Sequence, residues 1–166
     1  YYIRNKGYNI NIKETWQKLQ TWILTNDIIS YKRIALFHDN PTITPLNECQ
    51  YIGCVMVEDN QEVKSDRLPK FKIAEGVYAK FDLKGKTGDV LPFIHWVYHE
   101  WLPKNEYETT TKPSYAVYNK IDFLDESNEF DLSFYVSINF WLIKLDYNGE
   151  NFQSTKIKEV RKWFYI

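Results

Sequence analysis

The spacing of apolar residues along the chain predicts the same order of elements twice. In the first copy, a strand over residues 1–6 ends at Gly7, and a helix follows from about residue 13. The apolar side chains of this helix recur at helical spacing, as Trp16, Leu19, Trp22 and Ile23. Two strands come next, over residues 33–39 and 51–58. The predicted order is therefore strand, helix, strand, strand.

The second copy follows a polar linker, residues 59–67, which has no apolar periodicity. A strand over residues 77–83 leads into a helix over residues 88–101. The apolar stripe of this helix comprises Val90, Ile94, Val97 and Trp101. Pro103 ends the helix because proline lacks the amide donor that a further turn needs. Two more strands are predicted, over residues 115–119 and 132–138.

Two such units can place their strands in one antiparallel sheet with both helices on one side, so we predict an α+β fold. The first repeat occupies about residues 1–58 and the second about residues 77–139. Residues 140–166 belong to neither copy. The hairpin signal Asn148-Gly149 predicts that they form a C-terminal extension.

The composition is that of a soluble single-domain protein, with 166 residues, 44% hydrophobic, 26% charged and a net charge of −1. This charge gives no support to non-specific nucleic-acid binding. No apolar stretch approaches the ~20 residues that span a bilayer. We therefore expect a cytoplasmic protein without a membrane partner, with Cys49 and Cys54 reduced. The unusual feature is an aromatic content of 17%.

The second predicted helix carries the most informative local sequence. Phe93, Trp96 and Glu100 share one face at i, i+3 and i+7, which places a carboxylate on an otherwise aromatic surface. Ring faces attract positive charge and a carboxylate neutralises it, so this combination suits a cation. The alternative is that Glu100 points to water beside a large aromatic core.

The same helix raises the question of a metal. His95 and His99 stand at i and i+4, a spacing that lets two imidazoles share one ion. A third ligand would have to be His38 or a distant carboxylate, and neither lies in a known metal pattern. We therefore predict two surface histidines, no metal and no cofactor. His38-Asp39 is better explained by an Asx turn before Pro41 than by a catalytic triad.

Several segments together resemble the GyrI-like small-molecule-binding domains, which are also the effector-binding domains of AraC-type and MerR-type transcription regulators. The matching segments are His38-Asp39-Asn40-Pro41, residues 75–81 running into Lys84-Gly85, Tyr98-His99-Glu100-Trp101-Leu102-Pro103, and Arg4-Asn5-Lys6-Gly7-Tyr8 followed by Trp16, Leu19 and Trp22. The resemblance covers about residues 1–139.

The resemblance implies a groove between the repeats that binds lipophilic, often cationic, small molecules. In this sequence it assigns the groove's glutamate to Glu100 and a ligand-contacting tyrosine to Tyr115. The repeat geometry adds weaker candidates: Trp96, Phe93, Tyr8 and Trp22. It also implies that DNA is contacted only through a domain not present in these residues, if the chain is the sensing part of a regulator.

Some relatives hydrolyse reactive cyclopropane-bearing compounds with this glutamate and an aromatic partner. Binding is therefore the leading hypothesis for Glu100, and hydrolysis is the alternative. Members of the family mostly end at the last strand, so residues 140–166 depart from the pattern. We expect this extension either to cover the groove or to pair with an edge of the sheet.

Overall fold

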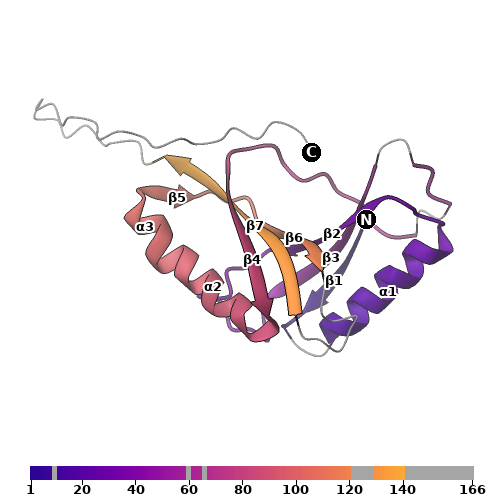
Figure 1. Ribbon diagram of the computed structural model, residues 1–166, viewed down its shortest axis with the longest axis horizontal. Coiled ribbons are helices and arrows are strands. Elements are labelled where there is room, and N and C mark those ends of the chain that lie inside the picture. The colour runs from indigo at the N-terminus through magenta and orange to yellow at the C-terminus, as the bar shows by residue number, and fades with distance from the viewer. Residues whose placement is uncertain (9–10, 59–60, 65–66, 121–128, 141–166) are drawn as a thin grey trace, which may run out of the picture.

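The computed structural model describes residues 1–8, 11–58, 61–64, 67–120 and 129–140 (Figure 1). The first half of the chain contains β1 (Tyr2–Lys6), α1 (Asn11–Thr25), β2 (Tyr31–Phe37) and β3 (Gln50–Val57). The second half contains β4 (Tyr78–Lys86), α2 (Val90–Trp96), α3 (Leu102–Lys104), β5 (Tyr107–Thr109), β6 (Ser114–Lys120) and β7 (Glu129–Phe140). A 3-10 turn, Thr87–Asp89, precedes α2, and a π-helical turn, Val97–Trp101, joins α2 to α3.

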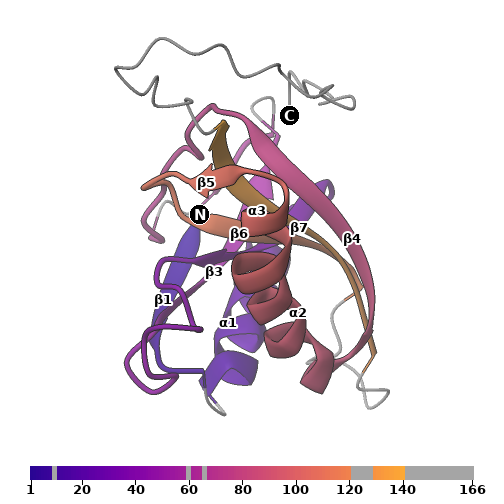
Figure 2. The ribbon, with the colours of Figure 1, turned by 90° about the vertical axis from the view of Figure 1, so that its left-hand side faces the viewer.

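The strands form one antiparallel sheet in the order β1-β3-β2-β6-β7-β4, with β5 paired to β7 off this path. The two repeats meet where β2 pairs with β6, around the facing residues Ala35 and Ala116. Both long helices lie on the same face of the sheet, α1 under the first repeat and α2 under the second (Figures 1 and 2). The predicted α+β fold of two strand–helix–strand–strand units is confirmed.

The structure differs from the sequence prediction in local details. β5 was not predicted, because three residues are too few to show an alternating pattern. The strand predicted over residues 33–39 ends at Phe37, and β7 begins at Glu129 rather than at residue 132. The predicted C-terminal hairpin lies outside the described residues.

Small residues occupy the centre of the sheet on the side that faces the helices. Gly53 of β3 pairs with Ala35 of β2, and Ala35 pairs with Ala116 of β6. A Cβ atom on Gly53 would lie 3.0 Å from Cγ2 of Thr15 and 3.1 Å from Cδ1 of Leu19. The missing side chain therefore lets α1 pack directly against the backbone of β3.

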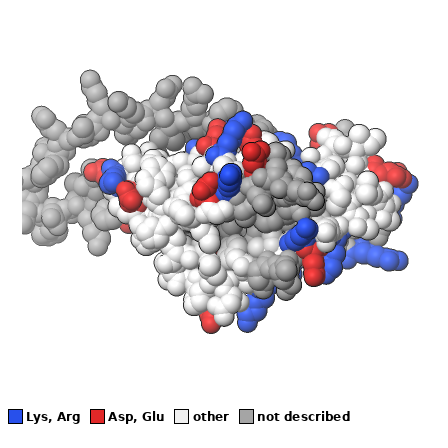
Figure 3. Space-filling model, turned by 60° about the horizontal axis from the view of Figure 1, so that its bottom comes forward, with Lys and Arg blue, Asp and Glu red and all other residues white. Residues whose placement is uncertain are grey.

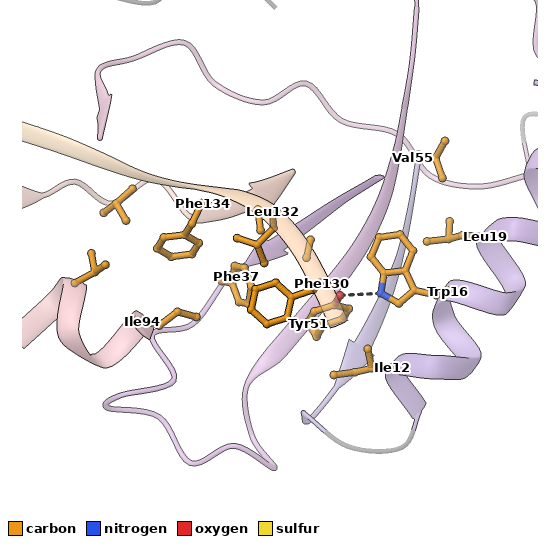
Figure 4. Packing of buried hydrophobic residues seen from close by; sticks show 14 of the residues in the cluster. Ile12, Trp16, Leu19, Phe37, Tyr51, Val55, Ile94, Phe130, Leu132 and Phe134 are labelled. Atoms are coloured by element: carbon orange, nitrogen blue, oxygen red, sulfur yellow. Dashed lines mark hydrogen bonds between the residues drawn. The ribbon is translucent and has the colours of Figure 1, made fainter. Parts of the chain in front are cut away.

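The main hydrophobic core fills the space between this face and the two helices (Figure 4). Trp16 and Leu19 reach into it from α1, Ile94 enters from α2, and Phe134 faces them from β7. Burying each such side chain contributes about 1.5–3 kcal/mol to stability. The Trp16 indole remains satisfied because its Nε1–H donates to the Tyr51 hydroxyl at 2.9 Å.

A smaller cluster, which includes Ile34 and Ile52, lies on the opposite face of the sheet. Residues 68–77 cross this face without regular structure. They are held there by a hydrogen bond from the Tyr2 amide to the Pro69 carbonyl, 3.0 Å, and by contact between the Tyr2 and Phe71 rings. The connection between the repeats thus also covers part of the sheet.

We expect Gly53→Val to lower the free energy of unfolding by about 1–3 kcal/mol, because the new side chain collides with Thr15 and Leu19. Gly88→Val is the matched control, since a Cβ atom there meets nothing within 4 Å. Urea unfolding of both variants tests the close approach of α1. Equal stability of the two variants would contradict it.

Candidate functional site

The helix that carries most of the predicted site changes its winding after Trp96. Over the π-helical turn Val97–Trp101 the hydrogen bonds run to the fifth residue, as shown by the Leu102 amide donating to the Val97 carbonyl. A π-helical turn has more residues per turn than an α-helix, so the side chains that follow its start point in different directions from those of a regular α-helix. The α-helical spacing that places Glu100 beside Phe93 and Trp96 therefore does not apply to this turn.

Glu100 lies in this turn on the exposed side of the helix, and 52% of its side chain is exposed. Its Oε2 accepts a hydrogen bond from Nζ of Lys104 at 3.1 Å, an i,i+4 ion pair. The carboxylate is thus partly neutralised in solvent by Lys104. Its role in ligand binding stays a prediction.

Phe93 and Trp96 are brought together, on the β4 side of α2. Both rings contact Phe81 of β4, with centroids 5.7 Å and 6.2 Å away. The Trp101 ring meets the same phenylalanine at 4.8 Å. Trp96 remains 40% exposed, so this group presents one ring to solvent.

The structure does not bring Tyr115 to these residues. Its neighbour Ala116 belongs to the core under the helices, so the side chain of Tyr115 points to the opposite face of the sheet. There it stacks on Tyr135, with centroids 4.7 Å apart, and meets Tyr78 at 5.4 Å. Burial is the main cause that raises the pKa of its phenol.

Trp22 also stands apart, because it packs against Tyr1 at a centroid distance of 4.7 Å. Tyr8, in contrast, lies on the helix side of the sheet between the two repeats. Its ring meets those of Phe37 and Tyr51 at 6.2 Å and 5.7 Å. Phe93 and Trp96 therefore lie together, and the other four predicted residues each occupy a separate place.

Tyr8 belongs to a group that we call the tyrosine cluster, Tyr8, Tyr51, Tyr98 and Tyr118. Tyr118 and Tyr98 lie close enough to Tyr8 to raise the pKa of its phenol further, although burial is the larger cause. The Tyr98 hydroxyl donates to Oγ of Ser114 at 3.1 Å. The Tyr8 hydroxyl is buried without a hydrogen-bond partner among the described residues. The cluster thus contains one polar atom whose hydrogen-bonding capacity is unused.

The sequence prediction missed three members of the tyrosine cluster, Tyr51, Tyr98 and Tyr118. Alternation along β6 puts Tyr118 on the same face as Ala116, and Tyr115 on the other. Both faces of that strand are apolar, so the pattern alone does not say which one meets the helices. The pairing register of β6 with β2 determines which face of β6 meets the helices.

A cleft of about 340 Å³ opens beside the cluster, between the loop that joins β2 to β3 and the start of α2. Its lining consists of Pro41, Thr42, Leu46, Leu91, Pro92 and His95. None of these is a lysine, arginine, aspartate or glutamate. On the face shown in Figure 3, charged side chains are sparse over the α2 half and gather over the α1 half.

The loop that forms one wall of the cleft is well anchored. Asn40 Oδ1 accepts the Thr42 amide at 3.0 Å, so the Asx turn at this position is formed by Asn40 and not, as predicted, by Asp39. Oδ2 of Asp39 accepts the Gln50 amide at 2.6 Å. The Tyr8 amide donates to the Leu46 carbonyl at 2.8 Å, so the tyrosine cluster and the cleft wall share a direct backbone contact.

The described residues contain no helix that is long and apolar enough to cross a membrane. In the same part of the chain, no three His, Cys, Asp or Glu side chains are grouped as metal ligands.

A duplicated α+β sheet with an apolar cleft between elements of its two halves places this chain among small-molecule-binding domains. Residues 1–139 match the GyrI-like small molecule binding domain, and the chain belongs to this family. It is similar to the DNA gyrase inhibitor of Citrobacter koseri, with 25% identity over 129 residues, which is 76% of this chain and 82% of that protein. It also resembles the DNA gyrase inhibitor of Citrobacter rodentium, with 23% identity over 109 residues, 64% of this chain and 69% of that protein.

The unpartnered hydroxyl of Tyr8 gives a test of the tyrosine cluster. We expect Tyr8→Phe to raise the free energy of unfolding by up to about 1 kcal/mol, because it removes a buried polar group that makes no hydrogen bond. Tyr98→Phe is the matched variant, and it should lower stability by about 0.5–1.5 kcal/mol because it loses the bond to Ser114. Urea denaturation separates the two. A loss of stability in Tyr8→Phe as large as that in Tyr98→Phe would show that the Tyr8 hydroxyl is bonded.

Proposed function

We propose that this domain binds a flat apolar small molecule, preferably a cation, in the cleft between the β2–β3 loop and α2. The observation that carries the proposal is the cleft itself. Its volume of about 340 Å³ falls within the range of small-molecule sites, roughly 300–1,000 Å³. One wall comes from the first repeat and the other from the second, so both repeats are needed to form it.

The tyrosine cluster supplies the polar recognition in this proposal. The Tyr8 backbone is bonded to Leu46, which lines the cleft, and the Tyr8 hydroxyl has no partner among the described residues. A ligand that reaches past the loop gains a hydrogen bond there without breaking an existing one. The surrounding ring faces favour flat and positively charged groups.

The charges around the cleft support a cationic ligand. Residues 41–47 and 90–99 contain no lysine or arginine. Carboxylates follow or precede both segments, as Asp39 before the first and Glu100 after the second. No lysine or arginine of these two segments therefore opposes a cation at the cleft.

A wider proposal follows from the family. Within the cytoplasm, ligand binding by this domain would serve as the sensing step of a transcription regulator whose DNA contacts lie outside these residues. The alternative, hydrolysis by Glu100, receives no support from the geometry. A general base acts within hydrogen-bond reach of its substrate, in a site from which water is largely excluded. Glu100 is instead half exposed and paired with Lys104.

Filling the cleft with a larger side chain should weaken ligand binding. We expect Leu46→Trp to weaken the affinity for benzyltrimethylammonium at least about tenfold, since the indole occupies the space of a drug-sized ligand. Leu24→Trp is the control, because Leu24 is 68% exposed on α1 and does not line the cleft. Isothermal titration calorimetry measures both. Undiminished binding by Leu46→Trp would place the ligand elsewhere.

The contribution of Glu100 can be separated from that of its lysine partner. We expect Glu100→Gln to weaken binding of benzyltrimethylammonium by roughly two- to fivefold, because exposed charges contribute only about 0.2–1 kcal/mol. Lys104→Gln should strengthen it by a similar factor, since it frees the carboxylate. The neutral isostere neopentylbenzene should respond to neither change. If both variants affect the two compounds alike, Glu100 takes no part in recognising the charge.

A further inference from the structure

Two imidazole rings face each other on the outer side of the second long helix. The ring centroids of His95 and His99 lie 4.3 Å apart, with their planes inclined by 30°. In a regular α-helix, side chains four residues apart are offset by about 40° around the axis. His99 lies in the π-helical turn, whose larger number of residues per turn brings its side chain more nearly into line with that of His95.

The sequence spacing alone predicted two surface histidines without a metal, but the short distance between the rings favours a different reading. We propose that His95 and His99 together bind a divalent transition-metal ion, with Zn²⁺ as the simplest probe. Zinc binds imidazole nitrogen at about 2.0–2.1 Å, so the two ligating nitrogens must come within roughly 3–3.5 Å of each other. A ring separation of 4.3 Å is compatible with this spacing. Both side chains are exposed, so their rings can rotate to present one nitrogen each without disturbing the core.

The surroundings of the pair also suit a cation. Residues 90–99 contain no lysine or arginine, so no fixed positive charge of this helix segment opposes the ion. The nearest acidic residue along the chain is Glu100, and the lysine that follows it is engaged with that carboxylate at 3.1 Å. The charges next to the pair along the helix therefore do not oppose a cation.

The site has two protein ligands. No third His, Cys, Asp or Glu is grouped with the pair among the described residues, so water completes the coordination. Such a site binds more weakly than a four-ligand structural zinc site. It also keeps open positions at the metal, close to the cleft that His95 helps to line.

The π-helical turn sets how closely the two histidines approach. Such turns make up well under 1% of residues in globular proteins and occur frequently at functional sites. In this chain the turn begins at Val97 and contains one of the two histidines. Pro103 follows the turn by two residues, and in a regular α-helix its ring would clash with the His99 carbonyl, so this proline contributes to the wider winding.

The test is calorimetric titration of the untagged chain with Zn²⁺ at neutral pH. We expect one ion per chain, with affinity reduced at least about tenfold by either His95→Gln or His99→Gln, since even loss of a group supporting a metal ligand costs that much. The double variant should bind Zn²⁺ with about the same affinity as the weaker-binding single variant, because one imidazole alone does not chelate the ion. His38→Gln is the matched control and should bind as the parent does, because His38 lies beside Asp39, after β2.

Several results would overturn the proposal. Absence of Zn²⁺ binding by the parent chain is one, and binding unaffected in the double variant is another. Loss of binding in His38→Gln with the helix variants intact would move the site to the end of β2. All three histidines are exposed, so circular dichroism of the variants should match the parent and exclude misfolding as the cause.

Discussion

The rest of the domain depends on the small side chains at the centre of the sheet. Gly53, Ala35 and Ala116 lie in one row across β3, β2 and β6, on the face that receives the helices. Larger side chains there would lift α1 from β3 and fill the space between the repeats. Because the row is small, the rings of Trp16, Phe37 and the tyrosine cluster can meet above it.

Ring contacts connect the cores of the two repeats. A continuous series of ring contacts, each with centroids 4.8–6.2 Å apart, runs through Tyr107, Trp101, Phe81, Phe93, Phe134, Phe37 and Tyr8. Tyr107 belongs to the second repeat and Tyr8 to the first. The rings therefore act mainly as a shared core, and only a few, such as Trp96, reach the surface.

Sequence patterns were sufficient for the fold and insufficient for the site. The duplicated order of elements follows from local periodicity, which the chain displays clearly in α1 and in the β4–α2 segment. The position of Glu100 depended on an assumed α-helical period, and the π-helical turn changes that period. Pro103 indicated an end to regular winding, but not where before it the winding would change. Tyr115 was assigned to the groove through the family resemblance, without a prediction of which face of the sheet it occupies. Both faces of β6 are apolar, and only pairing with β2 determines which face meets the helices.

The two repeats are joined in two different ways. Within the sheet they share only the pairing of β2 with β6, from Arg33–Tyr118 to Phe37–Ser114. Along the chain they are connected by residues 68–77, which cross the face away from the cleft. The β2–β6 pair is thus the strand pairing that sets the orientation of the two repeats, and with it the separation of the two walls of the cleft. A change in the twist between these two strands would change the width of the cleft while leaving each repeat's own strands paired and the covalent connection undisturbed.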